Sequence, residues 1–154
     1  MKSIRAQTLL SNLDTTVSNI LSFTNANELE KSYLAKFLVV FICGIYEEII
    51  EIIINEMVSR TNSKEIIKYV NESMKEKFRS PNIDNICRTL TMFNTDWAKI
   101  IRKMLHNQKC AINSIKDNKD LIAHGLPCMI TLGDVIKYYS DSKSIIEKID
   151  ELVL

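Results

Sequence analysis

The chain has 154 residues, 46% of them hydrophobic and 25% charged, with a formal net charge of +1. This length suffices for one domain with its own hydrophobic core, so we expect residues 1–154 to form a single domain. A net charge so near zero excludes a nucleic-acid-binding surface that spreads over the whole molecule; any such surface has to be local. Only 3 Gly and 2 Pro are present, too few for many tight turns, and we expect an all-α fold.

Cysteine spacing indicates whether the chain binds a metal, and hydropathy indicates where in the cell the protein is found. The cysteines form no short Cys-x-x-Cys or Cys/His pair, so we expect no metal site and no cofactor: Cys43, Cys87, Cys110 and Cys128. Cys43 lies in an apolar run and is expected to be a buried, reduced thiol. The N-terminus lacks the apolar segment of a signal peptide, and residues 37–46 are too few to span a bilayer. We therefore expect a cytoplasmic protein with no membrane partner.

The first two helices follow from apolar spacing. Apolar residues recur at steps of three and four over residues 3–24, which predicts a helix with one apolar face. Asn27 is placed to cap a second helix over residues 28–58, with Glu28 and Glu30 in its first turn. Residues 34–46 are apolar on nearly every side of this helix, which is typical of burial among other helices or against a second subunit.

Three glutamates follow on neighbouring positions of the second helix: Glu47, Glu48 and Glu51. Hard cations need several converging oxygen ligands, and no matching acidic cluster occurs elsewhere. We interpret this stripe as a solvated face from which one glutamate could still point into a cleft.

The middle of the chain predicts shorter helices. A third helix covers residues 64–78, and Ser80 and Pro81 fit the cap and first position of a short helix that reaches residue 90. A further amphipathic helix begins at residues 94–96 and ends near residue 107, where its basic residues suit a helix C-terminus: Arg102, Lys103, His106 and Lys109. Packing is the expected role of the remaining aromatic and sulfur side chains, namely Trp97, Tyr138, Tyr139, Met92, Met104 and Met129.

The last two helices complete the expected bundle. One covers residues 112–123, and a capping box of Thr131 and Asp134 opens the other. Together these elements predict an up-and-down bundle of five to six helices.

The stretch KDLIAHG, residues 119–125, carries the candidate chemistry. On a helix, Asp117, Asp120 and His124 share one face, whereas Lys119 lies about 140° round the axis from His124. Lys119 and His124 can therefore meet at one ligand only near a helix end or across a two-fold interface. From spacing alone, a histidine before a glycine is more often a cap or surface residue than a proton-transfer group.

This stretch resembles the RNxxAHG signature of the HEPN superfamily, in particular of the RiboL-PSP-HEPN and related toxin domains. The order of elements agrees over most of the chain, from a long apolar helix with an acidic end (FLVVFICGIYEEIIEII) to the AHG helix and a closing helix. The resemblance implies a small all-α domain, usually dimeric, with a metal-independent ribonuclease site at the dimer interface. It also implies a role in toxin–antitoxin systems or phage defence.

Two positions depart from the signature, because Lys119 replaces its arginine and Asp120 its asparagine. An ammonium cannot grip a phosphate through two parallel hydrogen bonds as a guanidinium does. The resemblance implies that His124 is a general base or acid, that Lys119 stabilises phosphate charge and that Asp120 orients the imidazole.

The resemblance further implies an RNA substrate whose own 2′-hydroxyl is the nucleophile. Gly125 permits close approach of a phosphate, and we expect Lys116 to bind substrate as well. Because the chain is nearly neutral, RNA also requires a local basic lining, for which Lys116, Lys119, Arg102 and Lys103 are candidates.

Three functions remain open on this evidence. The first is a homodimeric, metal-independent endoribonuclease, attenuated by lysine at position 119. The second is a non-catalytic binding module of the same fold that holds a nucleotide or a partner protein such as a nucleotidyltransferase antitoxin. The third is a structural helical dimer or antitoxin-like partner, which needs only the apolar second helix.

Overall fold

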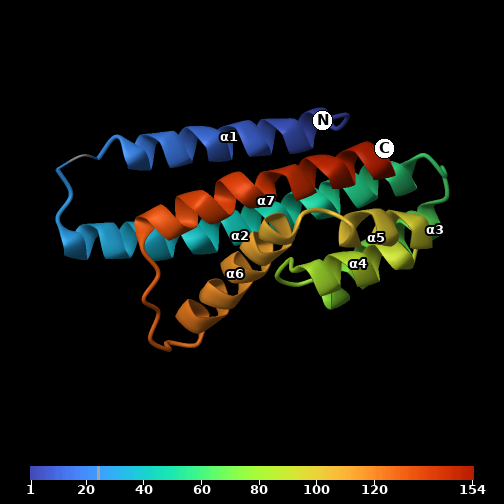
Figure 1. Ribbon diagram of the computed structural model, residues 1–154. Coiled ribbons are helices and arrows are strands. Elements are labelled where there is room, and N and C mark those ends of the chain that lie inside the picture. Colours follow the sequence, from blue (N-terminus) through green and yellow to red (C-terminus); the bar gives the residue numbers. More distant parts are fainter. Residues whose placement is uncertain (24) are drawn as a thin grey trace.

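The computed structural model describes residues 1–23 and 25–154, and in these residues the chain forms seven helices and no strand (Figure 1). The helices are α1 (Ile4–Leu21), α2 (Glu28–Ser59), α3 (Lys64–Lys77), α4 (Ile83–Thr91), α5 (Thr95–Arg102), α6 (His106–Ala123) and α7 (Leu132–Val153). The predicted all-α bundle is confirmed, with seven helices where five or six were expected. The predicted end of the first helix at residue 24 lies outside the described residues.

Three long helices, α1, α2 and α7, form the body of the molecule (Figure 1). α1 runs antiparallel to the other two, and α2 and α7 run in the same direction. Inside this body the hydroxyls of Tyr46 and Ser142 lie 3.0 Å apart and are fully buried. The Tyr139 hydroxyl donates to Asp14 at 2.6 Å and so joins α7 to α1.

Local capping residues set the ends of several helices. Asn27 accepts from the Glu30 N–H at 3.0 Å while Glu30 accepts from the Asn27 N–H at 2.7 Å, which confirms the predicted cap of α2. Thr131 and Asp134 form the predicted capping box of α7. Because these contacts join residues three apart, the local sequence suffices to predict them.

α2 is buried along most of its length but keeps one apolar face open. The exposed fractions are 64% for Leu29, 64% for Tyr33, 52% for Phe37 and 42% for Val40. These residues follow one another at steps of four, four and three and lie on one side of the helix. We call them the α2 stripe. The predicted burial among other helices therefore holds for the opposite face, and burial of the α2 stripe against a second subunit stays a prediction.

The structure corrects two predicted helix boundaries. α4 is capped by Asn82 and not by Ser80, because Asn82 accepts from the Asn85 N–H at 2.7 Å. The chain also breaks at residues 103–105, so His106 begins α6 and does not end the preceding helix. The Leu105 N–H donates to the Gln108 side chain at 3.0 Å and thereby starts the new helix early.

The packing prediction for the aromatic and methionine side chains holds in part. Tyr139 is buried, and Trp97, Tyr138 and Met104 pack against the core. Two methionines are exceptions, since Met92 is 57% exposed and Met129 92% exposed. Both lie on connecting segments outside the helices, where no second layer covers them.

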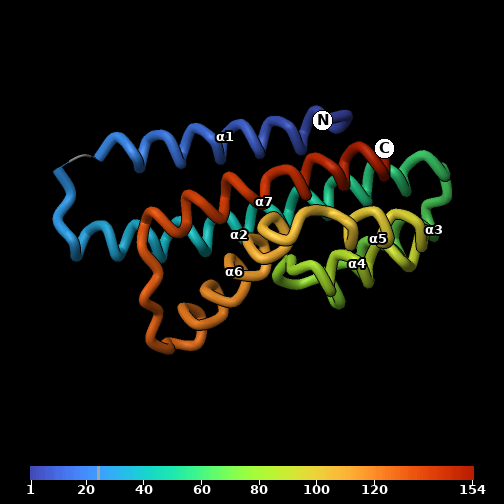
Figure 2. The backbone as a smooth tube through the Cα atoms, in the orientation of Figure 1, coloured from blue at the N-terminus to red at the C-terminus, as the bar shows by residue number. Residues whose placement is uncertain are grey.

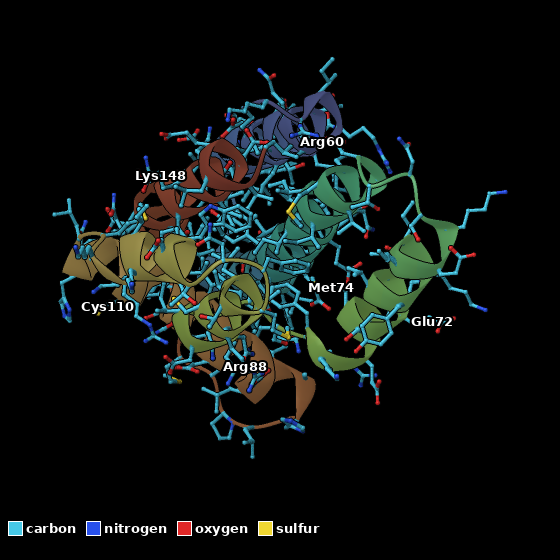
Figure 3. The ribbon with its side chains drawn as sticks, turned by 90° about the vertical axis from the view of Figure 1, so that its right-hand side faces the viewer. Arg60, Glu72, Met74, Arg88, Cys110 and Lys148 are labelled. Carbon is cyan, nitrogen blue, oxygen red and sulfur yellow. The ribbon has the colours of Figure 1, made fainter. Side chains whose placement is uncertain are left out.

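The short helices α3, α4 and α5 gather at one end of the body (Figure 1). Seen from that end, Met74 points from α3 toward α2, whereas Glu72 points outward (Figure 3). α6 starts beside α5 and diverges from the long helices, and residues 124–131 lead the chain back to α7 (Figure 2). The stretch KDLIAHG therefore lies at the projecting end of α6. In the described residues, no helix combines the length and apolarity needed to cross a bilayer.

Candidate functional site

The projecting end of α6 is closed by a left-handed glycine. Gly125 has φ of +67°. Its N–H donates to the Ile122 carbonyl at 3.1 Å, and the Leu126 N–H donates to the Leu121 carbonyl at 2.8 Å, the pair of bonds of a Schellman motif. A Cβ added at Gly125 would meet no atom within 4 Å, so glycine is required by the backbone angle and not by lack of space.

This closure presents His124 to solvent. His124 is the last residue of the helical turn, and its backbone N–H donates to the Asp120 carbonyl at 3.0 Å. Its side chain is exposed, and the imidazole makes no hydrogen bond to any residue that the structure describes. Both ring nitrogens are therefore available to a ligand or a second subunit.

Lys119 points back toward the body of the molecule. Its ammonium Nζ donates to the Ser80 hydroxyl at 2.9 Å and to Asp120 Oδ1 at 3.3 Å. The Lys119 side chain is 29% exposed. Within one protomer, Lys119 and His124 therefore point to different sides of α6, in line with their positions on the helix.

Asp120 is held by two lysines. Lys116 Nζ lies 2.9 Å from Asp120 Oδ2, and Lys119 Nζ lies 3.3 Å from Asp120 Oδ1. The hydrogen bond from Lys116 is the largest cause that lowers the pKa of Asp120, with a smaller opposing effect of burial and a further lowering by Lys119. The same bond raises the pKa of Lys116. At neutral pH the site thus carries an ionised carboxylate between two ammonium groups, and Asp120 meets His124 only through the backbone.

Two residues of this site escape the sequence prediction. Ser80 is 8% exposed, and its N–H donates to Glu47 Oε2 at 3.1 Å. The segment between α3 and α4 is thereby joined to α2 on one side and, through Lys119, to α6 on the other. The predicted cap role of Ser80 is wrong. Glu47 leaves the predicted solvated face, an exception that the prediction allowed for one glutamate. No local pattern signals these contacts, since Ser80 is 33 residues from Glu47 and 39 from Lys119.

Only part of the expected basic lining lies near Lys119 and His124. Lys116 lies at the site, paired with Asp120 and, at 3.5 Å, with Asp117. Arg102 ends α5 and accepts at its carbonyl from Lys109 Nζ at 2.8 Å, near the start of α6. Lys109 and Lys119 are about 15 Å apart along the helix at 1.5 Å per residue. Arg102 and Lys103 therefore lie at the far end of α6 from His124.

The thiol of Cys43 is buried and poorly suited to act as a nucleophile. Cys43 is 1% exposed, and burial raises the pKa of its thiol to about 12, with smaller effects of Lys119 and Glu47. The predicted buried thiol is confirmed. In residues 1–23 and 25–154, no group of three or more His, Cys, Asp or Glu side chains is arranged to hold a metal ion.

Comparison with known proteins gives one family. The family model described as RiboL-PSP-HEPN matches residues 3–154, which include all seven helices and the whole of the site. No curated protein and no solved structure gives a match.

Proposed function

Because the chain belongs to the RiboL-PSP-HEPN family, we propose that it is an endoribonuclease that cleaves RNA without a metal ion and acts as a homodimer. The observation that carries this proposal is the exposed imidazole of His124 at a projecting helix end, five residues after the ammonium that Ser80 and Asp120 hold at Lys119. The imidazole of His124 makes no hydrogen bond to the described residues, and the ammonium of Lys119 keeps one N–H beyond its bonds to Ser80 and Asp120, so both can meet a ligand.

The reaction needs proton transfer at two oxygens. The 2′-hydroxyl of RNA attacks the adjacent phosphorus, the bond to the 5′ oxygen breaks, and a 2′,3′-cyclic phosphate and a 5′-hydroxyl result. His124 takes the proton from the 2′-hydroxyl or gives one to the leaving 5′ oxygen. Two copies of His124 across a two-fold axis supply both steps.

Lys119 is suited to stabilise charge on the phosphate. An ammonium has three N–H donors, and in Lys119 two of them point to Ser80 and Asp120. The third donor remains for a non-bridging phosphate oxygen, on which negative charge grows as the 2′ oxygen attacks. We expect Lys116 and Gly125 to provide further contacts to the strand.

The α2 stripe supports dimerisation. Four large apolar side chains on one helix face form a patch of the kind that marks interfaces between proteins. Gly44, also exposed, continues this face by one turn from Val40, and Glu47 lies one turn further along. A second copy packed on the stripe would therefore reach toward Glu47, which accepts from the N–H of Ser80, and this suits a site made from both protomers.

The proposal is tested by RNA cleavage in the presence of EDTA. We expect the wild type to cut single-stranded RNA in EDTA and the His124→Ala variant to lose activity by about 100-fold or more. Because His124 is exposed and outside the core, the variant should keep its circular dichroism spectrum and melting temperature. Cleavage that EDTA abolishes, or that persists in the His124→Ala variant, would contradict the proposal.

A second candidate is a binding module that holds a nucleotide or a nucleotidyltransferase partner without cutting. The observation that favours it is the engagement of Lys119 by Ser80 and Asp120, at a position where the family signature has arginine. Saturable binding of a nucleotide with no turnover of any RNA would support this function over the first.

A further inference from the structure

Ser80 holds a backbone conformation that few residues adopt. Its φ is +57°, and Ser80 and Asn62 are the two non-glycine residues with positive φ in the described part of the chain. Pro81 follows directly and further restricts the residue before it. A serine in this conformation persists only where surrounding contacts over-determine it.

Those contacts come from three helices. The Ser80 N–H donates to Glu47 of α2, its carbonyl accepts from Asn85 Nδ2 of α4 at 3.1 Å, and its hydroxyl accepts from Lys119 of α6 at 2.9 Å. The first two contacts use the backbone and would remain in any residue at this position. The third uses the side chain alone, and its partner is the cation of the proposed site.

A lysine in place of arginine needs such a contact. An arginine fork is planar and orients itself on a phosphate, whereas an ammonium on a four-carbon stem is a mobile point charge. With Ser80 on one side and Asp120 on the other, the ammonium of Lys119 has one free N–H and one direction in which to donate it.

From this geometry we infer that Ser80 is a positioning residue for RNA cleavage, which aims the ammonium of Lys119 at the phosphate and offsets the loss of an arginine fork. The inference rests on the proposed function. It predicts that Ser80 acts on the reaction only through Lys119. A residue that merely folded the segment between α3 and α4 would affect the reaction whether or not Lys119 were present.

A double-mutant cycle on cleavage separates these cases. We expect Ser80→Ala to lower kcat by about tenfold to a hundredfold with little change in KM, since misplacement of a catalytic group acts on the transition state. In a Lys119→Met background the same substitution should cause no further loss. An equal loss in both backgrounds would overturn the inference.

A glycine variant with a matched control separates positioning from stability. Ser80→Gly removes the hydroxyl and relieves the positive φ, so we expect a higher melting temperature together with a lower kcat. Asn62→Gly relieves the same strain, at φ of +56°, in the turn between α2 and α3. It should raise the melting temperature and leave cleavage unchanged. Ser80→Gly with wild-type kcat would overturn the inference.

The two proposals fail in different ways. If the wild type cuts RNA, His124→Ala does not, and the Ser80 variants cut like the wild type, the inference falls and the proposed function stands. If the wild type cuts no RNA, the proposed function falls. Urea unfolding of the wild type, Ser80→Ala, Lys119→Met and the double variant then tests the contact between Ser80 and Lys119. If the changes in the free energy of unfolding are not additive, the contact between Ser80 and Lys119 is supported. Additive changes would overturn it.

Discussion

At the end of α6, the neighbouring residues His124 and Gly125 have different structural roles. His124 is exposed and makes no side-chain hydrogen bond among the described residues, so no hydrogen bond of the fold depends on its imidazole. Gly125 has φ of +67° and no atom near its missing Cβ, so its identity matters to the backbone. The AHG stretch thus combines an imidazole with the turn that exposes it.

This division predicts the effect of Gly125→Ala. An alanine at positive φ should lower the free energy of unfolding by about 1 kcal/mol, because only glycine adopts this conformation without a steric cost. Urea denaturation measures the change, and Gly133→Ala is the matched control. Gly133 lies in the first turn of α7 at an ordinary backbone angle, where an added Cβ would meet Thr131 at 3.8 Å. A stabilised Gly125→Ala variant would contradict the assignment of the turn.

At the scale of elements, prediction succeeds where a helix end depends on its own residues. The capping boxes of α2 and α7 and the restart at Asn94 join residues two or three apart and follow from the sequence. The predicted start of α4 fails because Ser80 is held by Glu47 and Lys119, which belong to helices distant in sequence. The break before α6 is predicted after residue 107 but lies at residues 103–105, since apolar spacing continues to Leu105.

The candidate site divides in the same way. Lys119, Asp120 and His124 lie on one helix, so their order and relative directions can be predicted from helical geometry. The partners of Lys119 cannot, because they depend on how α2 and the segment after α3 pack on α6. The positions of Arg102 and Lys103 could not be predicted either, since the sequence alone does not show that they lie at the far end of α6 from His124.

The contact between α1 and α7 predicts a pH dependence of stability. Burial raises the pKa of Asp14, but hydrogen bonds from Lys143 and Tyr139 outweigh it, so the pKa of Asp14 is lowered. A carboxyl with a lowered pKa in the folded state stabilises the fold above its ordinary pKa of about 3.9 and loses this effect as the pH falls through the lowered value.

We therefore expect Asp14→Asn to be less stable than the wild type at pH 7, with a difference that shrinks below about pH 4. Thermal melts of both proteins across this range measure it. Asp96→Asn is the matched control, because Asp96 is exposed and its partner Lys99 lies on the same helix, so the pair joins no second helix. A difference that grew toward acid pH would contradict the role of the Asp14 contact.

In the whole molecule, a second copy packed on the α2 stripe would account both for this exposed apolar face and for the projecting end of α6. Within one protomer, Lys119 and His124 point to different sides of α6. A two-fold axis beside the α2 stripe would bring the two copies of each residue into one site. The incomplete site and the open apolar face then have a single cause.

If the proposed dimer packs on the α2 stripe, we expect Phe37→Glu to weaken it by about 2 kcal/mol or more, roughly thirtyfold in Kd, because the substitution places a charge in an apolar interface. Sedimentation velocity over a range of concentrations measures the change, and RNA cleavage should fall with the dimer. Ile66→Glu is the matched control, since Ile66 is 49% exposed on α3 and outside the α2 stripe. A wild type that stays monomeric at all concentrations, or a Phe37→Glu dimer of unchanged affinity, would contradict the prediction.

Metal-independent cleavage with His124 as the proton-transfer group is tested most directly by the identity of the RNA ends that the wild type produces in EDTA. Cleavage by the RNA's own 2′-hydroxyl, with His124 as the proton-transfer group, predicts a 2′,3′-cyclic phosphate on one fragment and a 5′-hydroxyl on the other. Mass spectrometry of a defined oligonucleotide resolves these ends. Fragments with a 3′-hydroxyl and a 5′-phosphate, or no fragments that depend on His124, would contradict the account.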